Sequence, residues 1–343
     1  MSTFNYARLA SCLLMFVFAT FRLPAQKISF LDAHASTSFR GLSAPGAGVV
    51  WVSGSSGTIG RSTDAGLHWT WITVPGFEKH DFRDIQAFDS NTAVIMGIDT
   101  PAVILRTTDG GWHWNVVFRD DTPGMFLDAM EFDPNGAGMV VGDPMGKAPQ
   151  ARFYMAYTQD TGKTWAPVAL ANRPLADSGE GCFASSGTNI TEGHSTNIVF
   201  HPFVSGGPRS RVFRIDEGEP LPLIQGATTT GANSIGIEGD NWIVVGGDFS
   251  HDTISAGNCA YSLDNGYHWL VPHTPPHGYR SCVLHLWDKT WLCCGTSGVD
   301  ISTDGGDHWT LISTESFHVA NYPGSGRTVF LAGGKGRVAK LVL

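Results

Sequence analysis

The chain has 343 residues, a formal net charge of −9, 15% charged residues, 42% hydrophobic residues and 42 glycines. This length can bury a large core, and the composition is that of a turn-rich globular protein, which excludes a disordered or collagen-like chain. The acidic balance argues against nucleic acid as a partner, because nucleic-acid binding depends on basic surface that neutralises phosphates.

Residues 1–25 are expected to form a cleaved signal peptide, which leaves residues 26–343 as a single domain. Arg8 supplies a positive charge, the apolar run LASCLLMFVFATF follows it, and Leu-Pro-Ala precedes the expected cut before Gln26. The run is shorter than the ~20 residues that span a bilayer, and no later segment reaches that length. The sequence therefore predicts an exported protein, periplasmic or extracellular, with no integral membrane span after cleavage; an uncleaved anchor is the alternative.

The first segment after the leader, KISFLD, has the character of a lone strand without partners. Further along, apolar runs recur, and each is followed by a glycine-rich turn and a second strand. These runs are GVVWVSG, TAVIMG, AGMVVGD, NWIVVGGD and TWLCCG. No segment shows sustained helical periodicity with caps.

Each second strand ends in a phrase of the form hydroxyl–x–Asp–x–Gly–x–x–Trp. Its five copies contain Asp64 and Trp69, Asp109 and Trp114, Asp160 and Trp165, Asp264 and Trp269, and Asp304 and Trp309. The aspartates are 45, 51, 104 and 40 residues apart, so the unit is about 45 residues long and one copy has decayed near Asp216. A repeat of this length is typical of a four-stranded propeller blade.

The chain ends with RTVFLAGGKGRVAKLVL, which supplies two more strands but no outer one. Joining KISFLD to this unit closes a ring and removes two exposed sheet edges. The predicted fold is therefore all-β: a seven-bladed β-propeller of four-stranded antiparallel blades, closed by the N-terminal strand, with a monomer as the expected state.

The five phrases are expected to be structural turns between third and fourth strands. Glycine accepts positive φ, Asp accepts amide hydrogen bonds across the turn, and Trp buries a large ring beside the blade. Five copies on five blades cannot converge on one substrate. The same dispersal applies to the histidines that precede four of the tryptophans, so no metal site is predicted from His68, His113, His268 and His308.

The cysteines that follow the leader are odd in number and lack metal-type spacing; they are Cys182, Cys259, Cys282, Cys293 and Cys294. Export permits disulfides, and one or two pairs stay open. Adjacent cysteines on a strand point to opposite faces, which favours buried, unpaired thiols for Cys293 and Cys294.

The repeat carries a family resemblance. Ser62, Asp64, Gly66 and Trp69, with their four counterparts, resemble the Asp-box or BNR repeat of sialidases and other propellers. The stretches SFRGL, VVWVSGSSGTIGRSTDAGLHW and DFRDI resemble the photosystem II stability/assembly factor family of plants and cyanobacteria, over nearly the whole chain after the leader. The resemblance implies a propeller that assembles with a protein partner, but it is only weakly specific for any activity.

A candidate site follows from aligning the starts of the innermost strands, SFRGL, DFRDI, MFLDAM, EGCFAS, GYRSC and SFHVA. This alignment places three arginines at equivalent positions on one face of the channel, with Leu127 and His318 in two other blades. Carboxyl groups stand close to them in sequence or on the facing loops. The predicted ligand-binding or partner-binding set is Arg40, Arg83, Arg280, Asp84, Asp128, Glu131, Asp143, Glu180 and Asp248.

The arginine forks suit the carboxylates of a protein partner, an acidic peptide or an acidic glycan. The alternative is that each arginine pairs with a neighbouring Asp and joins blade to blade. The stretch GEGCFASSGTNI, residues 179–190, packs small and polar residues where other blades use bulkier ones, which suits a tight blade junction or the close approach of a ligand.

Three functions compete. The first is a non-catalytic binding or assembly propeller without cofactor. The second is a sialidase-like glycoside hydrolase or lyase, which needs two carboxyl groups about 5 to 9 Å apart, drawn from Asp84, Asp128, Glu131 and Glu180. The third, an oxidoreductase, lacks a strand–GxGxxG–helix unit or a haem motif.

Overall fold

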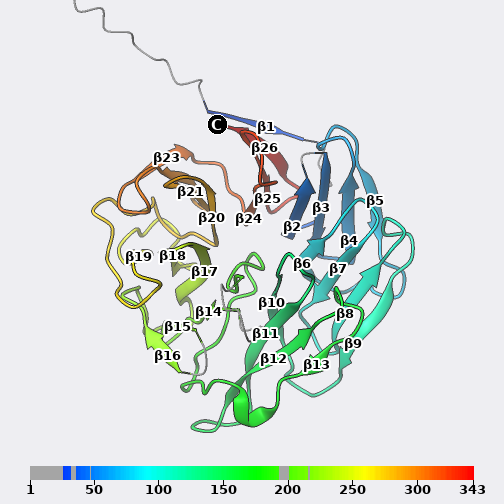
Figure 1. The fold of residues 1–343 in the computed structure, drawn as a ribbon, viewed down its shortest axis with the longest axis horizontal. Helices are drawn as coiled ribbons and strands as arrows, with labels where there is room; N and C mark the ends of the chain where they lie inside the picture. The colour runs from blue at the N-terminus through cyan, green and yellow to red at the C-terminus, as the bar shows by residue number, and fades with distance from the viewer. Residues whose placement is uncertain (1–25, 32–35, 47, 193–200, 215–216) are drawn as a thin grey trace, which may run out of the picture.

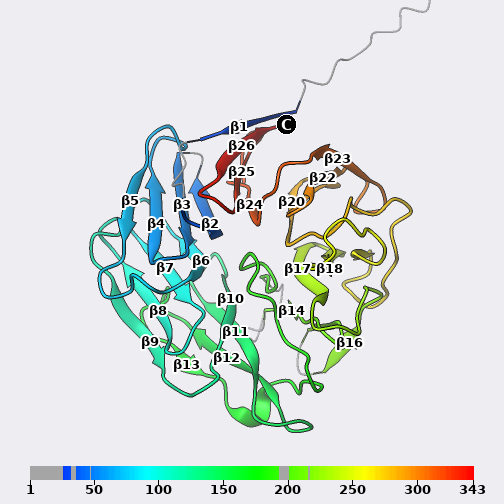
Figure 2. The same cartoon turned by 180° about the vertical axis from the view of Figure 1, so that it is seen from behind.

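Seven antiparallel sheets are arranged around one axis, which confirms the predicted seven-bladed propeller (Figures 1 and 2). The structure, a computed structural model, describes residues 26–31, 36–46, 48–192, 201–214 and 217–343. The expected signal peptide and the decayed phrase at Asp216 lie outside the described residues.

Four blades each consist of four consecutive strands. They are β2 (Phe39–Gly46), β3 (Val49–Gly54), β4 (Thr58–Ser62) and β5 (Thr70–Thr73); β6 (Phe82–Ala87), β7 (Ala93–Gly97), β8 (Ala102–Thr107) and β9 (Asn115–Asp120); β10 (Leu127–Phe132), β11 (Gly138–Met145), β12 (Arg152–Thr158) and β13 (Ala166–Pro167); and β20 (Cys282–Trp287), β21 (Thr290–Gly295), β22 (Gly298–Ser302) and β23 (Trp309–Ser313).

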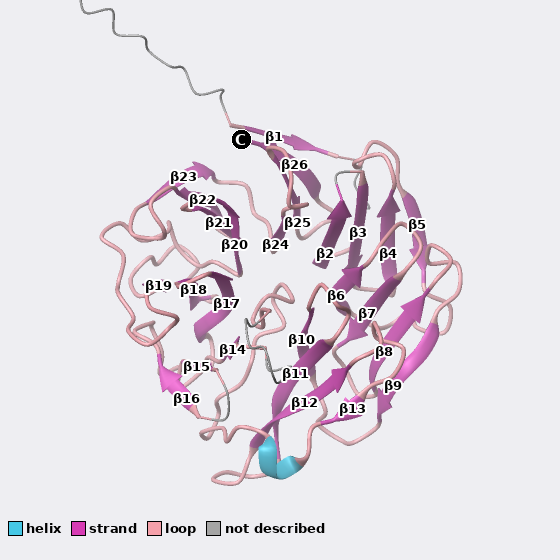
Figure 3. Ribbon diagram, viewed as in Figure 1, coloured by secondary structure: helices cyan, strands magenta, loops and turns pink. Residues whose placement is uncertain are grey.

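Two further blades have three strands each: β14 (Phe203–Val204), β15 (Arg211–Phe213) and β16 (Gly218–Pro220), then β17 (Thr230–Glu238), β18 (Asn241–Asp248) and β19 (Cys259–Ser262). The last combines β24 (Val319–Asn321), β25 (Thr328–Ala332) and β26 (Val338–Val342) with β1 (Lys27–Phe30). A single 3₁₀ turn, Leu170–Asn172, interrupts the strands and loops of the described chain (Figure 3). The described residues contain no helix with the length and hydrophobicity to cross a bilayer.

The ring is closed by hydrogen bonding between the two ends of the chain. Strand β1 pairs antiparallel with β26, from Lys27 opposite Val342 to Phe30 opposite Ala339. The amide of Leu31 extends this pairing to the carbonyl of Val338 at 2.8 Å. The closure agrees with the sequence-based expectation, since β1 takes the place of the missing outer strand.

The core lies between neighbouring blades. Second and third strands are covered on both faces, so they are nearly continuous apolar runs, as in Val49–Gly54 and Ala93–Gly97. Outer strands are half-exposed and more polar, as in Asn115–Asp120. The five cysteines of the described chain are free and buried in this core, as expected for Cys293 and Cys294, and none of the disulfides left open by the sequence forms among them.

The repeated phrases lie on the hairpins between third and fourth strands. In the first, the Ser62 hydroxyl donates to the Asp64 carboxylate at 2.9 Å and accepts the Gly66 amide at 2.8 Å. Asp64 in turn accepts the amide of His68 at 2.9 Å, and the Trp69 indole donates to the Gly66 carbonyl at 3.1 Å. The carboxylate is therefore used inside its own turn.

The centre of the ring is filled by residues 183–188, here called the axial segment (the green loop between the labels β10 and β24 in Figure 1). Its Ser186 hydroxyl donates to the carbonyl of Ser281 at 2.6 Å, and its Thr188 carbonyl accepts the Ile235 amide at 2.9 Å. Small residues are required because the channel is narrow. A Cβ added to Gly187 would lie 2.4 Å from Cγ of Asp84.

Gly187→Ala is expected to lower the free energy of unfolding by about 1–3 kcal/mol, since it adds a clash to a backbone with φ of +70°. Urea unfolding monitored by tryptophan fluorescence measures the loss. Gly76→Ala is the matched control, because Gly76 has a φ of +83° and no atom within 4 Å of the added Cβ. Equal losses in the two variants would show that packing around Gly187 contributes nothing to the free energy of unfolding.

Candidate functional site

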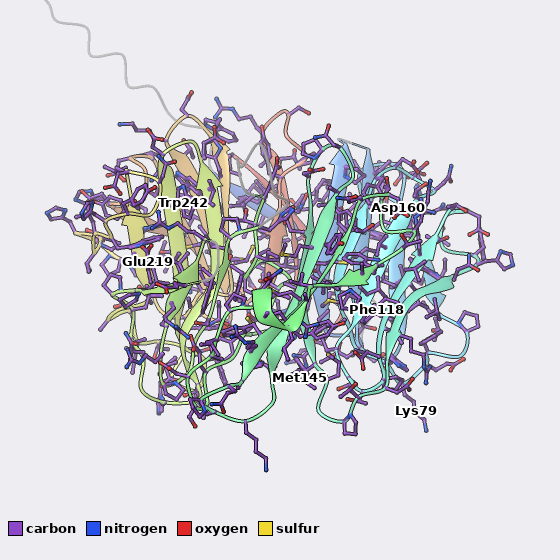
Figure 4. The ribbon with its side chains drawn as sticks, turned by 60° about the horizontal axis from the view of Figure 1, so that its bottom comes forward. Lys79, Phe118, Met145, Asp160, Glu219 and Trp242 are labelled. Carbon is purple, nitrogen blue, oxygen red and sulfur yellow. The ribbon has the colours of Figure 1, made fainter. Side chains whose placement is uncertain are left out.

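A pocket of about 820 Å³ lies at one end of the channel, against the axial segment. Its wall includes Pro144 and Gly146, which flank Met145 at the end of β11. Figure 4 shows Met145 and Lys79 toward one rim of the ring, and Asp160 and Trp242 toward the other. The pocket therefore lies away from the hairpin rim that carries Asp160.

The pocket is built by a β-bulge at the start of four innermost strands. The pairing register shifts between Phe39 and Gly41, and the same shift occurs in β6, β10 and β17. A bulge leaves one residue unpaired and re-aims its side chain. The four bulged residues all line the pocket: Arg40, Arg83, Asp128 and Asn233.

In three of these blades a glycine of the second strand pairs with the residue just before the bulged one. Gly54 pairs with Phe39 and Gly97 pairs with Phe82, so the arginine that follows each Phe is the residue that turns to the pocket. Gly142 pairs with Leu127 in the same way, which makes Asp128 the pocket residue of the third blade.

Arg280 was predicted to line the binding site, but it does not line the pocket. A Cβ on Gly295 would lie 2.9 Å from the Cα of Arg280, so Arg280 takes the core position of Phe39, and Ser281 is the residue that lines the pocket. The side chain of Arg280 is fully buried, and its Nε donates to Asp300 at 2.8 Å. The remaining guanidinium donors reach the Tyr279 and His277 carbonyls. Arg280 is thus a blade-stabilising ion pair and has no group free for a ligand.

Three predicted carboxylates also lie outside the pocket lining. Asp84 is buried and accepts the Met130 and Ile85 amides, each at 2.7 Å; burial raises its pKa to about 8. Burial, and then the charge of Asp84, raise the pKa of Glu131 to about 8 as well. Asp248 binds His251 at 2.7 Å at the end of β18.

Glu180 lines the pocket but is already engaged. Its carboxylate forms a buried ion pair with Arg211 and accepts the Ser205 hydroxyl at 2.5 Å. Asp177, also in the lining, pairs with Arg209 at 3.0 Å. These two acids therefore fix the wall of the pocket.

Arg40 has fewer hydrogen-bond partners than Arg83. It is half-buried, and its Nη1 donates to the Ser185 carbonyl of the axial segment at 2.9 Å. Among the described residues no carboxylate forms an ion pair with it, whereas Arg83 pairs with Asp81 at 2.8 Å. Burial, and then the charge of Arg83, lower the pKa of Arg40. Two neighbouring guanidinium groups with donors to spare can donate hydrogen bonds to one anion.

Two carboxyl groups share the pocket lining with the arginines. Asp143 accepts the Cys182 amide at 3.1 Å, and burial raises its pKa to about 6. Asp128 is fully buried; burial, and then Asp143, raise its pKa well above the ordinary value, although Arg83 and nearby amides act in the opposite direction. Its oxygens make no hydrogen bond of good geometry within the described chain.

Sequence reasoning missed the polar and aromatic groups that complete the pocket. Asn233 accepts the hydroxyls of Ser185 and Tyr279, each at 2.8 Å. Its strand, β17, is not among the aligned strand starts, and it has no aromatic–Arg pair like those of SFRGL and DFRDI. His318 donates Nδ1–H to the Phe39 carbonyl at 2.9 Å, and burial lowers its pKa to about 4, so it is neutral near pH 7. The aromatic lining comes from Phe126, Phe183, Phe249 and Tyr279.

The comparisons with known proteins agree with the fold and the resemblance. No family model matches the chain. The photosystem II assembly lipoprotein Ycf48 of Synechococcus sp. (strain CC9902) is 23% identical over 267 residues, covering 75% of this chain and 69% of Ycf48. This match supports the resemblance to photosystem II assembly factors.

Solved structures show the same architecture. A structure described as YCF48 bound to D1 peptide matches with a TM-score of 0.64 and 16% identity, over 94% of this chain and 96% of that one. YCF48 from Cyanidioschyzon merolae matches with 0.62 and 16%, over 92% and 98%. The Pan2 WD40 domain of Neurospora crassa reaches 0.63 at 13% identity, over 93% and 96%, so the structural similarity reports the propeller fold.

Arg280→Ala is expected to lower the free energy of unfolding by about 3–5 kcal/mol, because it leaves the buried Asp300 with only the half-exposed His277 as its ion-pair partner. Arg40→Ala, which breaks no ion pair, is expected to change it by less than about 1 kcal/mol. Denaturant unfolding of both variants compares the two arginines. Similar losses would contradict the different roles given to them.

Proposed function

We propose that this chain is an exported, non-catalytic propeller that binds a protein partner through a carboxylate-bearing segment held by Arg40 and Arg83. The observation that carries the proposal is the Arg40 guanidinium, half-buried in the pocket beside a second arginine and without an ion-pair partner among the described residues. A carboxylate placed between the two groups would relieve their repulsion and satisfy their free N–H donors.

The similarity to Ycf48 supports a peptide as the ligand, because a structure of YCF48 is described as bound to D1 peptide. The aromatic lining offers apolar contact for peptide side chains next to the anion site. The leader-like residues 1–25 support export as part of the proposal.

Hydrolysis of an acidic glycan is supported less well. Of the four carboxyl groups considered for it, Asp84 and Glu131 do not line the pocket, and Glu180 is held by Arg211 and Ser205. Sialosides and polyuronates incubated with the purified protein are therefore expected to remain intact. Turnover that disappears in Asp128→Asn would instead make the protein an enzyme.

Arg40→Ala and Arg83→Ala are each expected to weaken binding of a labelled acidic peptide by roughly 10- to 100-fold. The loss corresponds to about 1.5–3 kcal/mol for hydrogen bonds to a charged group. Fluorescence anisotropy with the intact chain measures the affinity.

Arg61→Ala is the matched control, because Arg61 is also half-buried and donates to a carbonyl, that of Ser90 at 3.0 Å, without lining the pocket. Wild-type affinity in the Arg40→Ala/Arg83→Ala double variant would remove the proposal.

Binding of the acidic peptide is expected to strengthen as the pH falls from 7.5 to 5.5. The pKa of Asp143 is raised to about 6, so its negative charge in the pocket lining is lost in this range, while peptide carboxylates stay ionised. Asp143→Asn should bind more tightly than the wild type at pH 7.5 and show a flatter profile. A variant with the full wild-type pH dependence would contradict this assignment.

A further inference from the structure

A second cluster of ligating side chains lies on the outer edge of the ring, away from the pocket. It consists of His273, Asp307 and His308, whose ligating atoms all lie within 4.8 Å of one another. His308 and Asp307 belong to the hairpin between β22 and β23, while His273 follows the outer edge of the preceding blade, where Leu270 bridges to Tyr261 of β19. The cluster therefore joins two neighbouring blades.

Backbone hydrogen bonds hold the two parts of this cluster together. The Thr274 amide donates to the Asp307 carbonyl at 3.1 Å, and the Trp309 amide donates to the Thr274 carbonyl at 2.9 Å. The His273 amide adds a bond to the Asp307 carboxylate at 3.1 Å. The side chains thus start from fixed backbone positions, which lowers the entropy cost of bringing them onto one ligand.

The imidazoles of His273 and His308 face the same carboxylate, that of Asp307. The rings of His273 and His308 are stacked, with centroids 5.5 Å apart and planes inclined by 6°. Nδ1 of His273 lies 2.7 Å from Asp307, and Nδ1 of His308 lies 2.8 Å from Asp304. Nδ1 of His308 also lies 3.5 Å from the second oxygen of Asp307, so both Nδ1 atoms are on the side of this carboxylate. An ion that replaces these hydrogen bonds would contact Nδ1 of each ring and a carboxylate oxygen.

The repeat shows that this site departs from the common pattern. In three other phrases the position before the His holds an exposed apolar residue, Leu67, Trp112 or Tyr267, where this phrase has Asp307. Their histidines pair only with the Asp of their own turn, as His113 does with Asp109 at 2.6 Å. Asp307 and His273 are both additions to the phrase, and they lie in contact with each other.

We propose that His273, Asp307 and His308 bind a divalent transition-metal ion of the Zn²⁺ type. Two imidazole nitrogens and one carboxylate oxygen are a common three-residue ligand set for zinc, with a fourth position left for water. Zinc needs ligand atoms about 2.0–2.2 Å away, so the side chains must close around the ion. They can do so because the two histidine side chains are 78% and 57% exposed.

The ion would connect the edge of one blade to the hairpin of the next. Because binding to the folded state alone stabilises it, Zn²⁺ is expected to raise the melting temperature. This proposal does not depend on the peptide-binding function, since the cluster and the pocket share no residue.

The test is titration of the full chain, without a histidine tag, with Zn²⁺ against a chromophoric chelator. One ion per chain is expected for the wild type, with at least about a tenfold loss of affinity in His273→Ala, His308→Ala and Asp307→Leu. Co²⁺ in place of Zn²⁺ should give visible absorption bands of a four-coordinate site in the wild type and lose them in these variants. Zn²⁺ should raise the melting temperature of the wild type only.

His113→Ala is the matched control, because it removes an equally exposed His–Asp pair in another blade. It is expected to leave Zn²⁺ affinity unchanged. Wild-type affinity in His273→Ala, or an equal loss in His113→Ala, would overturn the proposal. Wild-type affinity in Asp307→Leu would overturn the three-ligand assignment.

Discussion

The site of this protein depends on one backbone constraint, a β-bulge where each of four innermost strands begins. An unbulged strand would turn Arg40 and Arg83 toward neighbouring blades, because successive residues of a strand face opposite sides. The glycine that ends the second strand allows the close approach of the core residue before the bulge. A Cβ on Gly54 would lie 2.3 Å from the Ser38 carbonyl oxygen, so a larger residue there would displace the strand start that presents Arg40.

The axial segment provides hydrogen-bond acceptors for the two arginines that the bulges turn into the pocket. Its carbonyls at Ala184 and Ser185 accept Arg83 and Arg40, so the two guanidinium groups are oriented before any partner arrives. Most other charges around the channel are neutralised locally, as in the pairs of Glu180 with Arg211 and Arg280 with Asp300. Arg40 and Arg83, which both line the pocket, are therefore held in fixed positions, and fixed donors lower the entropy cost of binding a ligand. Without these two carbonyls, the repulsion between the Arg40 and Arg83 guanidinium groups would lower the stability of the fold.

The architecture could be predicted because its signals are local. Each apolar second strand and each Asp phrase identifies its own blade, and the unpaired KISFLD segment indicates the closure. The site was harder to predict because it depends on pairing register. GYRSC and SFRGL share an aromatic–Arg pair, yet Arg280 takes the core position of Phe39, one residue out of step. Counting back from the glycine that ends each second strand would have found Ser281. The roles of Asn233 and the axial segment depend on contacts between distant blades, which the sequence of one unit does not contain.

The buried, unpaired cysteines have a consequence for how the ring opens. Cys282 and Cys294 face each other across β20 and β21, and no covalent cross-link joins blades in the described part of the chain. The ring is therefore held closed by noncovalent contacts, above all by the short β1–β26 pairing. An alkylating reagent reaches the sulfurs of Cys282 and Cys294 only when that pairing or a blade interface separates. The rate at which they are modified would therefore measure how often the ring opens.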